Sequence, residues 1–157
     1  MPENRYWLVK SEPEVFSFDD LVASPKKTTH WDGVRNFAAR NHLRDMKMGD
    51  RVLFYHSNAK EIVGVAEVAR EAYPDATALD AKDPHFDPKS NRDDPTWFMV
   101  DLRAVEPLPR TVSLDEIKTV KGLEQMALIR LGRLSVQPVT EREYQIVRGL
   151  ADKKPKG

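Results

Sequence analysis

Cysteine is absent from this 157-residue chain. Its absence excludes a disulfide framework, thiolate zinc sites and cysteine nucleophiles, and it favours an intracellular location, cytoplasmic in a bacterium. Apolar runs of membrane-spanning length are absent too, so we expect no membrane partner. The first five residues, Met1-Pro2-Glu3-Asn4-Arg5, lack the basic and then apolar layout of a secretory signal, and we expect none.

The chain also lacks net charge, because 25 Lys and Arg residues balance 25 Asp and Glu residues. This balance argues against a broadly basic coat for nucleic acid. The charges are unevenly spread, however. Residues 26–51 hold seven Lys and Arg against three Asp, whereas residues 71–101 hold eight acids against three bases. The first region is suited to an anion, although ordinary sorting of surface charge produces the same pattern.

Motifs for metal, cofactor and nucleophile chemistry are missing as well. The four histidines are not spaced as a helical metal pair, and the acids of residues 75–101 lack EF-hand spacing. No G-x-x-x-x-G-K-[ST], G-x-G-x-x-G or G-x-S-x-G stretch occurs. We therefore expect no metal, no cofactor and no catalytic residue.

The length and the apolar fraction of 40% predict one domain over residues 1–150, followed by a polar tail over 151–157. Strand spacing is irregular and shows no βαβ rhythm. The pattern predicts an α+β fold, a small, mostly antiparallel barrel of about five or six strands with peripheral helices. We expect strands over 6–9, 51–57, 62–73, 96–105 and 134–139, and helices over 17–22, 36–46, 113 onward, 123–126 and 141–150.

Residues that cap helices or end strands predict where several elements begin and end. Four side chains are placed as helix N-caps: Ser17, Asn36, Ser113 and Thr140. In the helix over 36–46 we expect Phe37, Ala38 and Met46 to face the core. Residues 107–109, Pro-Leu-Pro, should end the fourth strand, and the long stretch over 74–95 should be a functional or mobile loop.

The run Trp31-Asp32-Gly33-Val34-Arg35-Asn36 organises the sequence. A flexible glycine leads into a helix start, and helix starts attract anions. Trp31 offers a stacking face and Arg35 a fork for phosphate or a base edge. The alternative is that Trp31 anchors the core and Arg35 is a surface salt-bridge partner.

Three other groups of polar residues accompany this run. Lys10 and Ser11 follow a strand end, and Tyr55-His56-Ser57-Asn58 stands at a hairpin end. Strand alternation sends His56 and Ser57 to opposite faces, so they do not form a base–nucleophile pair. Gln137, near Ser135, either reads a base edge or is a structural amide. Aromatic residues interleaved with small polar and basic ones are typical of a pocket that stacks a flat ring.

Six blocks of the sequence resemble the EVE domain family, in that family's order and spanning residues 6–150. This resemblance implies a PUA-like fold related to the YTH domains that read methylated adenine in RNA. It also implies a reader of modified bases, with modified cytosine in DNA (5-methylcytosine or 5-hydroxymethylcytosine) favoured. The blocks are residues 6–13 (YWLVKSEP), 31–36 (WDGVRN), 54–58 (FYHSN), 62–68 (IVGVAEV), 87–90 (DPKS) and 132–139 (GRLSVQPV).

With this resemblance, our first hypothesis is a binding module that holds a flipped-out or single-stranded modified base in a pocket walled by Trp31 and Tyr55, with Lys10, Arg35 and the helix start at Asn36 on the phosphates. The expected partner is modified DNA or RNA, or a free modified nucleotide, and an effector protein encoded separately is a further candidate. The implied ligand-binding residues are Lys10, Ser11, Trp31, Val34, Arg35, Asn36, Tyr55, His56, Ser57, Ser135 and Gln137.

Two alternatives to a binding module stay open at this point. One is an enzyme that acts on a modified nucleobase or nucleotide, for which His56 and Asp32 are the best candidates. The other is a protein-interaction domain that uses the acidic residues between 74 and 95.

Overall fold

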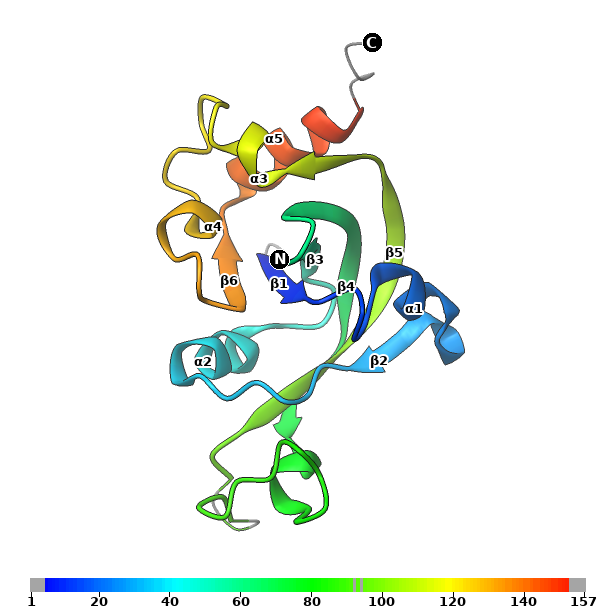
Figure 1. The fold of residues 1–157 in the computed structure, drawn as a ribbon, viewed down its shortest axis with the longest axis vertical. Helices are drawn as coiled ribbons and strands as arrows, with labels where there is room; N and C mark the ends of the chain where they lie inside the picture. Colours follow the sequence, from blue (N-terminus) through cyan, green and yellow to red (C-terminus); the bar gives the residue numbers. More distant parts are fainter. Residues whose placement is uncertain (1–4, 92, 94, 153–157) are drawn as a thin grey trace.

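The computed structural model describes residues 5–91, 93 and 95–152. Its strands are β1 (Tyr6–Ser11), β2 (Thr28–His30), β3 (Arg51–His56), β4 (Glu61–Pro74), β5 (Phe98–Ser113) and β6 (Val136–Val139). Its helices are α1 (Phe18–Ala23), α2 (Phe37–Asp45), α3 (Leu114–Ile117), α4 (Ala127–Arg130) and α5 (Glu141–Asp152), with 3₁₀ turns η1 (Pro25–Lys27) and η2 (Ala76–Leu79) (Figure 1). Among these helices none is long and apolar enough to cross a bilayer.

All six strands belong to one mixed sheet in the order β2-β5-β4-β3-β1-β6. Only the β1–β3 pair is parallel among the described strands, and the other four pairs are antiparallel. The predicted α+β class and the β3–β4 hairpin are confirmed. Closure into a barrel is not, because in the described chain no ladder joins the two outer strands, β2 and β6.

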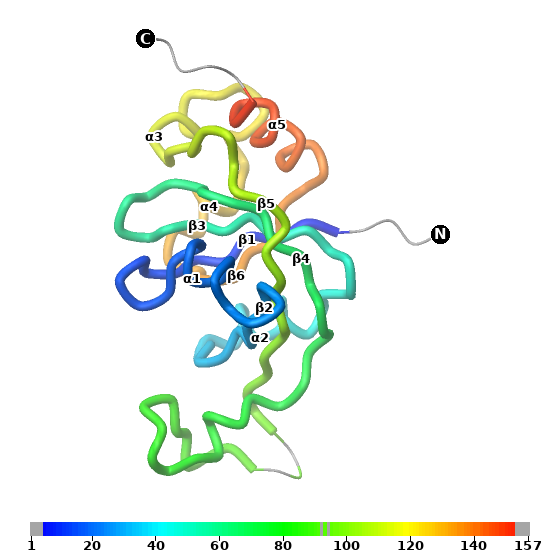
Figure 2. Tube along the Cα trace, turned by 90° about the vertical axis from the view of Figure 1, so that its right-hand side faces the viewer, coloured from blue at the N-terminus to red at the C-terminus, as the bar shows by residue number. Residues whose placement is uncertain are grey.

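Both faces of the sheet are buried, so neighbouring strand residues belong to different cores. Leu8, Leu53 and Tyr55 lie in a core with residues of α3, α4 and α5. Trp7 and Phe54 lie in the other core, with residues of α1 and α2. In Figure 1 α3, α4 and α5 lie in the upper part of the molecule, and α1 and α2 lie lower. Figure 2 shows the described residues of the segment 75–97 at one end of the molecule, beyond α2.

The predicted N-caps are confirmed, but several element boundaries are wrong. β5 continues through Pro107 to Ser113, since Pro107 pairs with Gly64 where the register shifts, and proline is tolerated at such irregularities. The expected helix over 123–126 forms instead at Ala127–Arg130. Strand β2 was not expected. The first two residues of the expected tail belong to α5, and 153–157 lie outside the described residues.

The orientation expected for α2 is also wrong. Phe37 is 60% exposed and Ala38 is exposed, whereas Ala39, Leu43 and Met46 are fully buried. These three buried residues are spaced by four and three positions, which is the stripe of one helix face. Phe37 stands two residues before Ala39 and therefore points away from that face.

Candidate functional site

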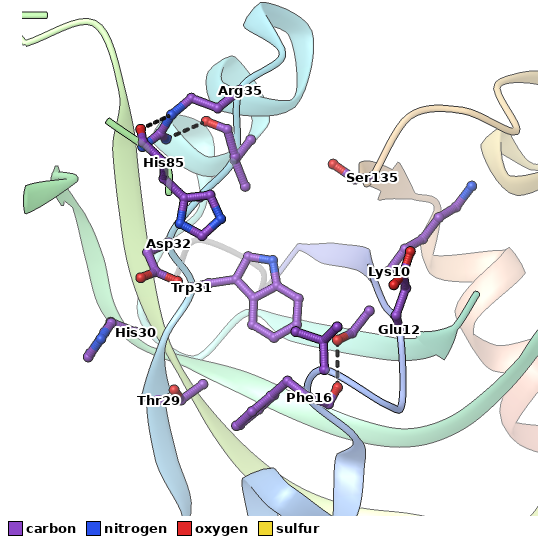
Figure 3. A pocket seen from close by; sticks show the side chains of 14 residues that line it. Lys10, Glu12, Phe16, Thr29, His30, Trp31, Asp32, Arg35, His85 and Ser135 are labelled. Atoms are coloured by element: carbon purple, nitrogen blue, oxygen red, sulfur yellow. Dashed lines mark hydrogen bonds between the residues drawn. The ribbon is translucent and has the colours of Figure 1, made fainter. Parts of the chain in front are cut away.

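A cavity of about 610 Å³ opens beside Trp31, a volume in the range of small-molecule sites. Four separate parts of the chain line it: the end of β1 with the turn after it, residues 29–35, His85 and Ser135 (Figure 3). Six of the eleven predicted ligand-binding residues are in this lining: Lys10, Ser11, Trp31, Val34, Arg35 and Ser135.

Trp31 is held by aromatic neighbours but is not enclosed by them. Its ring packs edge-to-face against two phenylalanine rings. The centroid distance is 6.4 Å and the interplanar angle 77° for Phe16, and they are 5.5 Å and 83° for Phe54. Its backbone N–H donates to the Val100 carbonyl at 2.7 Å, which extends β2 along β5. The residue stays partly exposed, and Figure 3 shows its indole in the middle of the lining side chains. Trp31 is thus both a partner of the core and a surface of the cavity.

Gly33 and His85 are in close approach at the cavity wall. Gly33 has φ +79°, in the left-handed region, and a Cβ there would lie 2.7 Å from His85 Nε2. The other imidazole nitrogen, Nδ1, lies 3.2 Å from Asp83 Oδ1. The imidazole is therefore oriented by Asp83 and packed against the backbone at Gly33, and His85 lines the cavity there.

Arg35 connects the segment 75–97 to the cavity wall through hydrogen bonds. Its Nη1 donates to Asp75 Oδ2 at 3.0 Å, and its Nε and Nη2 donate to the His85 carbonyl at 3.0 and 2.6 Å. Nη2 also donates to Thr77 Oγ1 at 3.2 Å, and Nη1 to the Val34 carbonyl at 3.0 Å. The salt-bridge interpretation of Arg35 is confirmed, with a buried partner, and its donors are directed into the protein.

The buried partner is Asp75, whose side chain is fully inaccessible. Burial raises the pKa of Asp75, but hydrogen bonds from Thr77, the Gly33 N–H and Arg35 outweigh burial and leave this pKa below its ordinary value. Asp75 therefore stays charged and holds Gly33 and Arg35 in one arrangement.

Lys10 and Ser135 lie across the cavity from His85 in Figure 3, and Ser11 is also part of the lining. Lys10 Nζ donates to the Gly132 carbonyl, and burial lowers the pKa of this amine. Ser11 Oγ donates to the Phe16 carbonyl at 2.5 Å, which folds the turn after β1. The Lys10 N–H donates to the Ser135 carbonyl at 3.0 Å, so β1 brings Ser135 to the cavity.

Tyr55 and His56 do not line the cavity. Tyr55 is 4% exposed and belongs to the core on the other sheet face from Trp31, so it does not form the second wall expected of it. His56 accepts a hydrogen bond at Nε2 from the Phe18 N–H, at 3.0 Å, and so holds the start of α1. Burial lowers the pKa of His56, against the opposing effect of nearby acids.

The remaining three predicted residues, Asn36, Ser57 and Gln137, support the cavity from outside its lining. Asn36 caps α2, with its Oδ1 accepting from the Ala39 N–H at 2.9 Å. Ser57 donates its N–H to the Ser11 carbonyl at 2.9 Å. Gln137 is buried and donates from Nε2 to the carbonyls of Leu131 and Leu134, both at 2.9 Å, which shapes the turn before Ser135.

The residues on which the two alternatives rest are placed as follows. Asp32 lines the cavity whereas His56 lies outside its lining, so the best acid–base candidates are separated. The acidic segment uses its carboxylates on itself: Asp80, Asp83 and Asp87 each accept from a backbone N–H two residues on. In the described part of the chain no group of three His, Asp or Glu side chains is placed to hold a metal.

Eight lining residues were not among the predicted ligand-binding residues, and His85 is the one that comes from a distant part of the chain. It lies within the long segment 74–95, whose length already indicated a functional loop. No local pattern distinguishes His85 from the other three histidines. Its position depends on the hydrogen bonds from Arg35 to its carbonyl and on the space left by the absence of a Cβ at Gly33.

Comparisons with known proteins agree on one family. The EVE domain model matches residues 5–150. Thymocyte nuclear protein 1 of Rattus norvegicus is 46% identical over 171 residues, covering 97% of this chain and 76% of the rat protein. The crystal structure of human THYN1 protein in complex with 5-methylcytosine-containing DNA is similar with a TM-score of 0.92 at 45% identity, covering 97% of this chain and 100% of that one.

The fold extends to a more distant group. The YTH domain of the Zygosaccharomyces rouxii MRB1 protein, solved with N6-methyladenosine RNA, matches with a TM-score of 0.58 at 15% identity, covering 100% of this chain and 90% of that one. The shared feature is the PUA-like fold.

Proposed function

This chain belongs to the EVE domain family, and on that premise we propose that residues 1–150 form one module that binds nucleic acid through a modified base, with modified cytosine in DNA the favoured ligand. The observation that carries the proposal is the open cavity beside the ring of Trp31. This ring is partly exposed and is held by edge-to-face contacts with Phe16 and Phe54. The human relative that was solved with 5-methylcytosine-containing DNA supports the choice of ligand.

Trp31 is the stacking surface in this proposal. Its edge contacts with Phe16 and Phe54 set the ring plane before a ligand arrives, which lowers the entropic cost of binding. The volume of about 610 Å³ accommodates a single base that has left its stack. A base reaches this cavity from a single strand or by flipping out of a duplex.

His85 and Ser135 are the groups suited to read the base edge, from opposite walls of the cavity. In the tautomer that donates from Nδ1 to Asp83, the other ring nitrogen of His85, Nε2, is an acceptor. An acceptor at this position suits an exocyclic amino group, which cytosine and adenine both carry and thymine lacks.

The phosphate contacts need a different assignment from the one that the sequence suggested. Arg35 and Asn36 are engaged within the protein, and among the residues implied for phosphate only Lys10 keeps its side chain at the cavity rim with a single described acceptor. We infer a binding module rather than an enzyme, because the acid–base candidates His56 and Asp32 are separated.

The test is a binding titration at fixed salt with short single- and double-stranded DNA and RNA, each carrying one modified cytosine or adenine, against unmodified strands. Salt is held constant because phosphate contacts alone produce salt-dependent affinity. We expect preference for one modified base, a loss of roughly 5- to 150-fold in Trp31→Ala, and a smaller loss in Trp31→Phe. Equal, weak, salt-sensitive binding to every strand would reject the proposal.

A further inference from the structure

Phe37 is a large aromatic side chain that the protein holds at its surface. It is 60% exposed and lies off the buried stripe of α2. It is nevertheless fixed, because its ring stacks on Trp97 with centroids 5.1 Å apart and planes 25° from parallel. Trp97 is itself 7% exposed and donates from Nε1 to Asp87 Oδ2 at 2.6 Å. An exposed ring that is held in place by a buried neighbour is suited to contact a partner.

One guanidinium group lies close to each ring of this pair. The Cζ of Arg35, at the cavity, lies 5.5 Å from the Trp97 ring, and the Cζ of Arg40 lies 5.0 Å from the Phe37 ring. Arg40 is fixed in turn, since Nη1 donates to the Thr96 carbonyl at 2.9 Å and Nε to Asn41 Oδ1 at 3.1 Å. A continuous series of planar groups therefore runs from the cavity wall to the surface at Phe37, with positive charge beside the exposed ring.

The distance from the cavity to Phe37 suits a nucleic-acid strand. The two contacts that connect Arg35 to Phe37 put them at most about 11 Å apart. A strand advances about 3.4 Å per stacked nucleotide, so a strand that passes the Arg35 side of the cavity spans this separation within about three nucleotides. Aromatic faces and cationic side chains next to each other are the usual elements of single-strand binding.

We propose that Phe37 is a second stacking surface, which contacts a base one to three nucleotides from the base in the Trp31 cavity, on the same strand. This inference rests on the proposed function for the identity of the partner. It assigns Phe37 and Arg40 to the strand and leaves the cavity to the modified base, so the two sites have separable effects on affinity.

The experiment compares two probes at one salt concentration. One is a single-stranded DNA heptanucleotide with 5-methylcytosine at its centre, and the other is 5-methyl-deoxycytidine monophosphate. Phe37→Ala should weaken heptanucleotide binding by about fivefold or more and leave mononucleotide binding within about twofold. Phe37→Tyr should retain affinity. Met48→Ala is the matched control, because Met48 is 62% exposed and follows the other end of α2.

A second arm removes the partner base rather than the protein ring. A heptanucleotide with abasic flanking positions should bind the unaltered protein as weakly as the normal heptanucleotide binds Phe37→Ala. The inference is overturned if Phe37→Ala binds the heptanucleotide normally, if it loses both probes equally, or if the unaltered protein binds both probes with equal affinity.

Failure of the proposed function has a different signature. The unaltered protein would then show no preference for the modified over the unmodified heptanucleotide. A Phe37-dependent loss on both heptanucleotides would still support a stacking surface for nucleic acid, and absence of all binding would reject both proposals.

Discussion

Nη1 of Arg35 lies 3.0 Å from Oδ2 of Asp75, whose side chain is fully buried. This ion pair joins the segment with excess positive charge, 26–51, to the segment with excess negative charge, 71–101. The uneven charge of the sequence is thus partly a signal of internal pairing. The pair also positions His85, since the same guanidinium donates to the His85 carbonyl.

Arg35→Ala should therefore lower the free energy of unfolding by about 2 kcal/mol, because it removes the cationic partner of the buried Asp75 carboxylate and both side-chain donors to the His85 carbonyl. Urea unfolding measures this change, and Arg133→Ala, at an exposed position, should change it by less than about 0.5 kcal/mol. A double-mutant cycle with Asp75→Asn should show coupling of about 1 kcal/mol or more. Unchanged stability with a reduced salt dependence of DNA binding would instead make Arg35 a phosphate contact.

Gly33→Ala should destabilise the fold and disturb the cavity at once. The backbone at φ +79° disfavours any side chain, and the new Cβ would displace the imidazole of His85. We expect a loss of about 1–2 kcal/mol by urea unfolding together with weaker ligand binding.

Gly149→Ala is the control for this substitution. Gly149 lies within α5, and a Cβ added there would have open space within 4 Å, so alanine should stabilise the protein by about 0.5–1 kcal/mol. A Gly33→Ala protein as stable as the unaltered one would show that the backbone there adapts.

Acidification should destabilise the protein through His56. Burial lowers the pKa of His56 in the folded state, and its Nε2 must be unprotonated to accept from the Phe18 N–H. Since the folded pKa is depressed, this stability is present above the ordinary histidine pKa of about 6.5 and is lost as the pH falls below it. His42, whose pKa burial also lowers, acts in the same direction.

The measurement is the free energy of unfolding between about pH 7.5 and about pH 5, a range that spans the ordinary histidine pKa, for the unaltered protein and for His56→Gln. The glutamine variant should lose less stability over this range, and His30→Gln, at an exposed position, should follow the unaltered protein. Parallel curves for His56→Gln and the unaltered protein would contradict the role given to His56.

Local hydrogen-bonding patterns were the part of the fold that could be predicted from the sequence. Ser17, Asn36, Ser113 and Thr140 all cap helices, because a cap depends on residues within three positions. The buried face of α2 was also predictable, since the spacing of its buried residues marks one helix face, and the inward placement of Phe37 departed from that spacing.

Tertiary contacts account for most of what the sequence could not reveal about the site. Tyr55 and Trp31 are both aromatic, yet they lie on opposite faces of a sheet that is buried on both sides. The sequence around Arg35 is typical of an exposed residue, and tertiary folding brings the acceptors Asp75 and His85 to it. Composition indicated an aromatic and polar cavity, whereas long-range packing decided which residues line it.

The position of β1 between β3 and β6 has a consequence for folding. The Lys10 N–H bonds to the Ser135 carbonyl, so one cavity wall requires pairing between the first strand and the sixth. Pairings this distant in sequence have a high entropic cost of loop closure and slow the folding of a domain. The cavity is therefore incomplete until β6 docks, and an intermediate that holds only the β3–β4 hairpin has no binding site.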